Sequence, residues 1–329
     1  MKKLFIFLLA AILALFTFEI FLKHSPFEYG VSPGVYDKDI GVWHKKNFSG
    51  YSISECYKNK YIYNNKGLPK EIRPYDAQKD DIVLLGDSFV EAMMVKNEHI
   101  VHNEMAKQLD FKYNVLNYGV SGTSPIQAFV ILQKKVDFSR LKYVVQFVEL
   151  DGDIMEVNPQ DQNSMGRPKA YVKFKSLTDY QVIPPREITI KDKIGDFLGD
   201  YQIYFFIKKL TYSLQKKLSN KAVEPTVKKE KKEVDLSENW RNLEGAIFQT
   251  HQLAKKHHIK FLLAINAKDE KKKEQLQTFL KAHNIPSLSI QDEAKRRGVE
   301  LKSYVCDAHW TDETHGKIAN LILNTGFID

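Results

Sequence analysis

The sequence predicts an α/β fold in which a parallel sheet is covered by helices on both faces, with a membrane helix in front of it. Short apolar runs alternate with helical segments after residue 80, a pattern typical of βαβ units. A long apolar stretch opens the chain. The 329 residues are 43% hydrophobic and 12% aromatic, and this globular composition excludes a disordered or fibrous chain.

The N-terminal segment predicts export to the outer side of a bacterial inner membrane. Lys2 and Lys3 precede residues 4–22, which are apolar except for Thr17 and Glu19. This length suits a helix that crosses the bilayer, and the positive end is expected to stay in the cytoplasm. No small-x-small cleavage pattern closes the stretch, so an uncleaved signal anchor is favoured over a removed signal peptide.

The charge of the chain is basic without being typical of a nucleic-acid-binding protein. Lys and Arg number 49 and Asp and Glu 41, so 49 − 41 gives a formal net charge of +8. Many of the lysines lie in one run over residues 219–234, and no compact basic-aromatic motif accompanies them, so we expect no nucleic acid. We interpret the run as a solvated or disordered loop rather than a binding patch. The charge favours an anionic neighbour such as a membrane surface.

The segment between the membrane helix and the sheet holds the first of two cysteines. Residues 25–78 are rich in Tyr, Asn, Gly and Lys without sustained periodicity, which predicts an irregular lead-in with short strands. An exported chain permits a disulfide between Cys56 and Cys306, and two unpaired buried thiols remain the alternative. If the two are bonded, their Cα atoms must lie within about 7 Å of each other.

The chain divides into a signal anchor over 1–24, the lead-in over 25–78, and a main domain over 79–329 with an insertion over 155–235. The strands of the sheet are expected near 81–86, 113–117, 143–148, 259–265 and 286–290. Helices are expected near 98–109, 125–136, 201–218 and 237–257, after Asp269, and from Asp312 onward. We expect the insertion to shape a substrate groove.

Four polar clusters follow strands or precede the last helix, at residues 86–89, 117–122, 149–153 and 307–310. Ligand-binding groups gather at the carboxyl ends of the strands in an open parallel sheet. Each cluster alone has a structural explanation, because Asp87 and Ser88 suit a helix N-cap, Gly119 and Gly122 suit turns, and His309 suits a packing role. Together the clusters place several kinds of reactive group at one edge.

The combined set is what acyl transfer needs. Ser88 offers a hydroxyl, and His309 offers a base that can remove its proton. Asp307 would fix the imidazole tautomer and stabilise the imidazolium. The glycine-containing segments offer backbone N–H groups for an oxyanion. The sequence therefore predicts a serine nucleophile in a Ser-His-Asp arrangement.

Three of the clusters resemble the sequence blocks of the SGNH (GDSL-type) hydrolase superfamily. The blocks read Ile82-Val-Leu-Leu-Gly-Asp-Ser88-Phe, Val115-Leu-Asn-Tyr-Gly-Val-Ser-Gly122 and Asp307-Ala-His-Trp-Thr-Asp-Glu-Thr-His315, and the similarity covers about residues 80–154 and 258–325. The resemblance implies a flavodoxin-like three-layer αβα sandwich. It also implies Ser88 as nucleophile, His309 as base, Asp307 as its partner, and the N–H groups of Ser88 and Gly122 as oxyanion donors.

The third block departs from the pattern of this superfamily. The family usually offers a Gly-Asn-Asp segment whose Asn side chain donates to the oxyanion, whereas this chain reads Glu149-Leu-Asp-Gly-Asp153. Either Asp153 or Gly152 stands at the Asn position. An ionised Asp153 would repel negative charge, so the chain would be slower, use another donor, or have lost activity.

Further candidates for the site are Asp87 and Trp310, as residues that contact substrate. Trp310 would line the acyl pocket or pack under the sheet edge. His315 is six residues after His309 and would not share a helix face with it, so we expect no metal site. The chain has no phosphate-binding glycine loop, and we expect no cofactor.

These residues predict an envelope enzyme that cleaves or transfers a short acyl group, notably acetyl, through an acyl-Ser88 intermediate. The Asp-x-His-Trp form of the last block, with export, is similar to members associated with exopolysaccharide acetylation. The expected partners are an acylated glycan or small acyl ester and a multi-pass membrane acyltransferase. The alternative is a catalytically weakened module that binds a glycan or such an acyltransferase.

Overall fold

A five-stranded parallel sheet forms the centre of the molecule in the computed structural model, which describes residues 2–25, 30–158, 168–219 and 235–329. Its strands are Asp81–Gly86 (β5), Asn114–Gly119 (β6), Leu141–Glu149 (β7), Lys260–Asn266 (β10) and Ser287–Ser289 (β11). They lie in the order β11-β10-β7-β5-β6, and all neighbours are parallel. The first strand of the sheet thus lies between the second and the third, which is the flavodoxin-like order.

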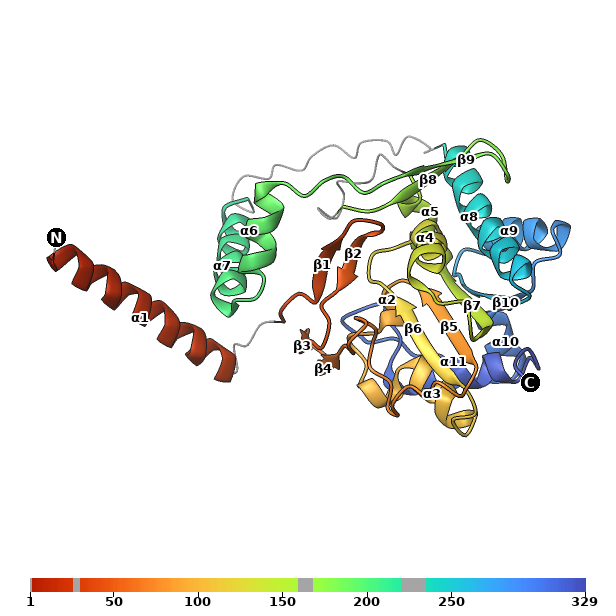
Figure 1. Cartoon of the computed structure of the whole chain (residues 1–329), viewed down its shortest axis with the longest axis horizontal. Coiled ribbons are helices and arrows are strands. Elements are labelled where there is room, and N and C mark those ends of the chain that lie inside the picture. The colour runs from red at the N-terminus through yellow and green to blue at the C-terminus, as the bar shows by residue number, and fades with distance from the viewer. Residues whose placement is uncertain (1, 26–29, 159–167, 220–234) are drawn as a thin grey trace.

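Helices cover both faces of this sheet, so the predicted α/β class is confirmed (Figure 1). One face carries Pro125–Lys135 (α4), Leu150–Glu156 (α5), Ser237–Lys256 (α8) and Glu270–Ala282 (α9). The other carries Ser88–Glu91 (α2), Val101–Gln108 (α3), Ile290–Arg296 (α10) and Asp312–Leu323 (α11), with a short 3-10 turn at Asn97–His99. Successive residues of β5 alternate between these two cores, Val83 and Leu85 on one side and Ile82 and Leu84 on the other.

The lead-in forms two antiparallel hairpins beside the sheet. Their strands are Gly34–Asp37 (β1) with Gly41–His44 (β2), and Ser49–Ile53 (β3) with Lys58–Ile62 (β4). Trp43 and Leu68 are buried in the same core as α4 and α8. The lead-in is therefore packed onto the main domain rather than joined to it by a bare connection.

Within its described residues, the insertion contains a hairpin and two helices. Tyr171–Phe174 (β8) pairs with Tyr180–Ile183 (β9), and Ile190–Leu198 (α6) and Gln202–Ser219 (α7) follow. The helix expected near 201–218 corresponds to α7. The lysine-rich run interpreted as a loop lies, from residue 220 to 234, outside the described residues.

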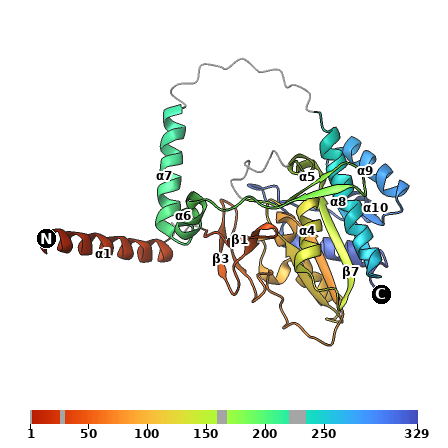
Figure 2. The ribbon, with the colours of Figure 1, turned by 45° about the horizontal axis from the view of Figure 1, so that its top comes forward.

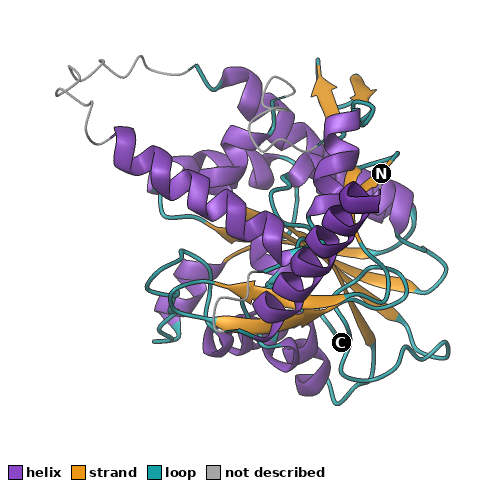
Figure 3. Ribbon diagram, turned by 90° about the vertical axis from the view of Figure 1, so that its left-hand side faces the viewer, coloured by secondary structure: helices purple, strands orange, loops and turns teal. Residues whose placement is uncertain are grey.

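The first helix, Lys2–His24 (α1), projects away from the rest of the molecule (Figures 1 and 2). In Figure 3 it points toward the viewer, with the strands behind it. It has 23 residues, and its most apolar window has a mean hydropathy of 2.6. By length and composition it is able to cross a membrane.

Candidate active site

Ser88 stands at a sharp turn between β5 and α2. The strand ends at Gly86, and Asp87 caps the helix by accepting a hydrogen bond of 2.9 Å from the N–H of Phe89. A Cβ at residue 86 would lie 2.4 Å from Val90 Cγ2, so only glycine allows this approach of strand and helix. The turn presents Ser88 at the carboxyl edge of the sheet, as predicted from the sequence.

His309 and Asp307 reach Ser88 from the loop that precedes α11. The Nε2 atom of His309 lies 2.7 Å from Ser88 Oγ, and its Nδ1 atom is hydrogen-bonded to Asp307 Oδ1. A carboxylate only accepts, so Nδ1 carries the imidazole proton and Nε2 is free to accept from the serine hydroxyl. The structure thus brings together the three side chains that the sequence analysis selected, over 221 residues of chain.

Tyr57 completes this chain of hydrogen bonds from the lead-in. Its hydroxyl donates to Asp307 Oδ2 over 3.0 Å. Burial acts to raise the pKa of Asp307, but the hydrogen bond and charge of His309, together with Tyr57, outweigh it and lower that pKa. Asp307 is therefore held as the carboxylate. Burial and Asp307 raise the pKa of Tyr57, which stays a neutral donor.

Cys56 and Cys306 form a disulfide whose Cα atoms are 5.9 Å apart. The two cysteines immediately precede Tyr57 and Asp307 in the sequence. The bond joins the lead-in to the His309 loop at the point where those two side chains meet. Of the two alternatives left open by the sequence, the structure contains the disulfide.

The second cluster forms a tight loop beside α2. Gly122 has a φ of +71°, a conformation that favours glycine. The N–H of Ser121 donates to Glu91 Oε2 over 2.6 Å. A Cβ at residue 119 would lie 2.4 Å from the backbone nitrogen of Glu91, so the end of β6 touches α2 directly. These contacts fix the backbone around Gly122 relative to Ser88.

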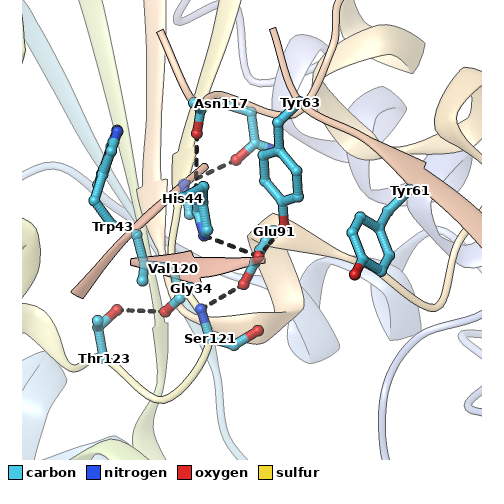
Figure 4. A network of polar contacts seen from close by, with 12 residues as sticks. Gly34, Trp43, His44, Tyr61, Tyr63, Glu91, Asn117, Val120, Ser121 and Thr123 are labelled. Carbon is cyan, nitrogen blue, oxygen red and sulfur yellow. Dashed lines mark hydrogen bonds and ion pairs between the residues drawn. The ribbon is translucent and has the colours of Figure 1, made fainter. Parts of the chain in front are cut away.

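Glu91 is the centre of a buried polar network (Figure 4). One of its oxygens lies 2.9 Å from His44 Nε2 and also accepts a hydrogen bond from the hydroxyl of Tyr63. His44 Nδ1 lies 2.9 Å from the carbonyl oxygen of Gly67. Both ring nitrogens of His44 therefore face oxygen acceptors, one on the side chain of Glu91 and one on the backbone of Gly67.

The charge state of Glu91 follows from these partners. Burial alone would raise its pKa, but the charge and hydrogen bond of His44, with the bonds from Ser121 and Tyr63, lower it to about 2. Sequence reasoning did not find Glu91, His44, Tyr63 or Tyr57. Two signals were present: Glu91 is three residues after Ser88, and Tyr57 adjoins a cysteine. His44 and Tyr63 carried no local signal, because only the folding of the lead-in brings them to α2.

The third cluster is the start of α5, and this corrects the expected charge of Asp153. Its side chain is buried and accepts a hydrogen bond of 2.9 Å from the N–H of Glu149. Burial, followed by the charges of Asp87 and Glu149, raises the pKa of Asp153 well above its usual range. The sequence suggested an ionised carboxylate, whereas this environment favours the neutral acid, which has a proton to donate. Gly152, the other alternative at this position, donates its N–H to Glu149 Oε2 over 2.7 Å.

Asp87 belongs to the same acidic group. Burial raises its pKa to about 7, with contributions from Glu149 and Glu156, although its hydrogen bond from Phe89 acts in the opposite direction. Two neighbouring carboxyl groups with raised pKa values titrate as a pair that shares protons. Asp87 thus acts as the helix cap that the sequence allowed, in a site adjacent to Ser88.

Trp310 and His315 lie in the core between the sheet and α11. Trp310 is 4% exposed, and its ring centroid is 4.8 Å from that of Phe89. Its position favours the packing alternative over a wall of the acyl pocket. His315 is buried, and its Nδ1 accepts a hydrogen bond of 3.3 Å from the N–H of Val101. Burial lowers the pKa of His315 to about 3, so it serves as a neutral acceptor that joins α11 to α3.

Comparison with known proteins gives structural likenesses only. No family model matches the chain, and no curated protein matches it. A protein described as a lipolytic protein of the G-D-S-L family, from Desulfitobacterium hafniense DCB-2, has a TM-score of 0.42 and 12% identity over 75% of this chain and 99% of its own.

Two esterases give similar scores. A two-domain esterase active on acetylated mannans has a TM-score of 0.40 and 12% identity over 76% of this chain and 48% of its own. An acetyl xylan esterase from the rumen bacterium Butyrivibrio proteoclasticus has a TM-score of 0.36 and 9% identity over 78% of this chain and 66% of its own. Structural similarities at these TM-scores and identities do not define an activity for this chain. Its activity has to be argued from its own side chains.

Proposed function

We propose that the protein is a serine-dependent ester hydrolase or O-acyltransferase of the SGNH type. The observation that carries this proposal is the hydrogen-bonded series of Ser88, His309 and Asp307, with 2.7 Å between Ser88 Oγ and His309 Nε2. Serine is a weak nucleophile at its own pKa and needs a base within hydrogen-bond reach. His309 meets that requirement, and a carboxylate orients it.

The reaction proceeds in two balanced steps. Ser88 Oγ attacks the ester carbonyl carbon while its proton passes to His309 Nε2, and Asp307 stabilises the imidazolium. The tetrahedral intermediate expels the alcohol, which takes that proton and leaves an acyl-Ser88 ester. Water or a sugar hydroxyl then loses its proton to His309, attacks the acyl carbon and releases Ser88, which recovers the proton. The first acceptor gives hydrolysis and the second gives transfer.

The backbone around α2 supplies the oxyanion donors in this proposal. The N–H of Ser88 lies at the first position of the helix, and the loop of Gly122 is held against the same helix through Ser121 and Glu91. Loss of one oxyanion donor typically costs about 2.7–4 kcal/mol of barrier. In its neutral form Asp153 is a third candidate donor, in place of the amide that the family pattern would offer.

We assign the substrate to acylated glycans or small acyl esters at the cell envelope. A pocket of about 330 Å³ next to Ser121 is lined by residues of the lead-in, including Tyr51 and Tyr61, and by Glu91. Its lining includes Ser121, the neighbour of Gly122 in the second cluster, and a pocket of this size suits a small ligand. With α1 crossing the inner membrane, the domain would face the extracytoplasmic side. In the transferase case, a multi-pass acyltransferase in the same membrane would supply the acyl group.

A fluorophosphonate probe tests the proposed nucleophile. We expect the purified full-length chain to become labelled at Ser88, and the labelling to vanish in Ser88→Ala. The matched control is Ser139→Ala, at an exposed serine in the loop before β7, which should label as the wild type does. Equal labelling of Ser88→Ala and wild type would assign the reactive residue elsewhere and refute the proposal.

The roles of His309 and Asp307 are tested with a small acetyl ester. His309→Ala and Ser88→Ala should lose activity to a similar extent, because the two residues act as a unit. Asp307→Asn should lose less than either if its role is orientation. Hydrolysis by His309→Ala at the wild-type rate would contradict the assignment of the base.

The second candidate function is a binding module with weakened catalysis, and the acidic third cluster favours it. Asp153 and Asp87 place two carboxyl groups beside the proposed site, where ionisation would oppose an oxyanion. An absence of probe labelling in a folded wild-type chain would support this candidate, and binding to acetylated and deacetylated glycans would then define it.

A further inference from the structure

The second half of the insertion exposes two apolar strips. On α6 the strip consists of Ile190, Ile194 and Phe197, and on α7 it consists of Ile207, Leu210 and Leu214. Every one of these side chains is at least 50% exposed, and Ile190 reaches 77%. Their spacings of three and four residues place each set along one side of its helix. We call the two helices with these strips the α6–α7 platform.

The platform is attached to the end of α1. The carboxylate of Glu19 accepts hydrogen bonds from the N–H groups of Gln202 (2.9 Å) and Ile203 (3.0 Å), which open α7. The ring of Phe18 packs edge-on against Phe206 at 5.6 Å. Glu19 is buried by these contacts although it belongs to the apolar helix. The first turn of α7 therefore lies at the same level as Glu19 along α1.

That level coincides with a membrane boundary. At about 1.5 Å per residue, Glu19 lies about 26 Å along the helix from Lys2, and a hydrocarbon core is about 30 Å thick. With the lysines at the cytoplasmic boundary, Glu19 and the start of α7 reach the opposite boundary. Figure 2 shows α7 running crosswise to α1 from this junction, so α7 extends along the membrane surface when α1 crosses the membrane.

The charges beside the strips suit a lipid surface. Lys208 and Lys209 are exposed on α7, whose sequence has no acidic residue, whereas on α6 the exposed Lys191 and Lys193 are balanced by Asp192 and Asp196, so the excess positive charge lies on α7. Amphipathic helices with apolar residues on one face and lysines on the polar face lie in the interface, where anionic headgroups attract the lysines. Continuity with α1 and this charge favour lipid over other occupants of the apolar strips.

We propose that the α6–α7 platform lies in the outer headgroup region of the membrane that α1 crosses, with its apolar strips inserted among the lipids. The partner is a bilayer containing anionic phospholipid. Phe205 of α7 also lines the pocket that Ser121 and Glu91 line, so the platform connects the membrane surface with the loop that holds Gly122. The chain is then held at two levels, by a spanning helix and by an interfacial pair.

The test uses the full-length chain in nanodiscs of phosphatidylethanolamine and phosphatidylglycerol. The only two cysteines are joined in the disulfide, so single cysteines introduced as Ile194→Cys and Leu210→Cys can be labelled selectively with a polarity-sensitive fluorophore. The matched controls are Lys209→Cys, on another side of α7, and Lys271→Cys, exposed on α9. Circular dichroism checks that each labelled chain is folded.

We expect a blue-shifted emission at 194 and 210 that shallow spin-labelled lipids quench more strongly than deep ones. The two controls should be quenched mainly by aqueous iodide. Equal iodide quenching at all four positions would overturn the proposal. Protection of positions 194 and 210 from iodide without quenching by spin-labelled lipid would also overturn the proposal. If that protection depended on protein concentration, a second copy of the chain would cover the strips instead. Protection found only in native membranes would replace the lipid by a membrane-protein partner.

Discussion

Asp87 and Glu91 lie at the two ends of the same short helix, and their surroundings shift the two carboxyl pKa values in opposite directions. Burial acts to raise both. Glu91 faces His44 and two further donors, Ser121 and Tyr63, and its pKa falls to about 2. Asp87 faces other carboxyl groups and accepts one backbone hydrogen bond, and its pKa rises to about 7.

The difference between the two ends of α2 shows that the partners, and not the depth of burial, decide the charge. The Glu91 carboxylate fixes the backbone at Ser121, whereas acids with raised pKa values adjoin the proposed nucleophile. The carboxylate at one end therefore stays ionised over a wide pH range, and the acids at the other end respond to pH.

The largest expected effect is at the Glu91 end. Glu91→Gln removes the charge of a buried carboxylate that contacts His44 and accepts from Tyr63 and Ser121, and removing one partner of a buried pair typically costs about 3–5 kcal/mol. Urea unfolding at neutral pH measures the loss. The control is Glu293→Gln, because Glu293 also has its pKa lowered to about 2, by Arg296 and Arg297, but on a surface helix. Glu293→Gln should lower the free energy of unfolding by about 0–1 kcal/mol. Equal losses in the two variants would contradict the greater importance of the buried carboxylate.

A smaller loss is expected when one donor to Glu91 is removed. Tyr63→Phe deletes the hydroxyl that donates to this carboxylate, and a hydrogen bond to a charged group is worth about 1.5–3 kcal/mol. Tyr61→Phe is the control, since that hydroxyl donates to the neutral carbonyl of Val31 and should cost about 0.5–1.5 kcal/mol. If the neutral bond proves the more costly, the charge assigned to Glu91 is wrong.

At the acidic end, the expected effect has the opposite sign and depends on pH. A carboxyl pKa raised in the folded state gives stability that is present below the usual value of 3.8 and is lost as pH rises through about 7. Asp153→Asn keeps an acceptor for the N–H of Glu149 and removes one charge, so the variant should gain stability over wild type as pH rises from 5 to 8. Each pKa unit corresponds to about 1.4 kcal/mol.

Thermal unfolding across this pH range measures that difference. Asp292→Asn is the control of opposite direction, because its pKa is lowered by Lys273 and its loss should destabilise the chain at neutral pH. With a small acetyl ester, the rate of Asp153→Asn relative to wild type should also rise with pH if the residue faces the oxyanion. If the difference in stability between Asp153→Asn and wild type does not change with pH, the pKa of Asp153 is not raised in the folded chain.

The smallest effect is expected when one hydrogen-bond donor to Asp307 is removed. The pKa of Asp307 is lowered like that of Glu91, but Asp307 is less buried. Tyr57→Phe removes one neutral donor to a carboxylate that His309 still holds, so about 1 kcal/mol of transition-state stabilisation, or about fivefold in kcat, should be lost. Tyr304→Phe is the control, because this neighbouring ring, 5.1 Å from Tyr57, donates to Met94 and Asp312 instead. A loss as large as that in His309→Ala would give Tyr57 a more direct role.

The sequence predicts the central sheet well, because its strands are short apolar runs with polar residues at their ends. The run at 81–86 is β5 as observed, and the run at 259–265 is offset from β10 by one residue. Helix α5 was missed, because Glu149-Leu-Asp-Gly-Asp153 has the composition of a loop. Acidic residues are in fact favourable in the first turn of a helix. Glu149 is the N-cap of α5, because its side chain accepts a hydrogen bond from the N–H of Gly152.

The proposed site divides in the same way. Ser88, Gly122 and His309 stand beside strand ends or a helix start, so a local pattern was enough to select them. His44 and Tyr63 come from the lead-in and contact Glu91. The position of the lead-in on the domain depends on tertiary packing, which a local sequence pattern does not predict. The charge of Asp153 also depends on its neighbours in space, because Asp87 is distant from it in the sequence.

The disulfide between Cys56 and Cys306 gives the chain a dependence on its compartment. Disulfides persist in oxidising environments and are rare in the cytoplasm. Before oxidation, no covalent bond holds Tyr57 against Asp307, and the lead-in is held on the domain only by its non-covalent contacts. If the domain lies outside the cytoplasm, as proposed above, the disulfide would form only after the chain has crossed the membrane, and the position of Tyr57 against Asp307 would be fixed at that stage.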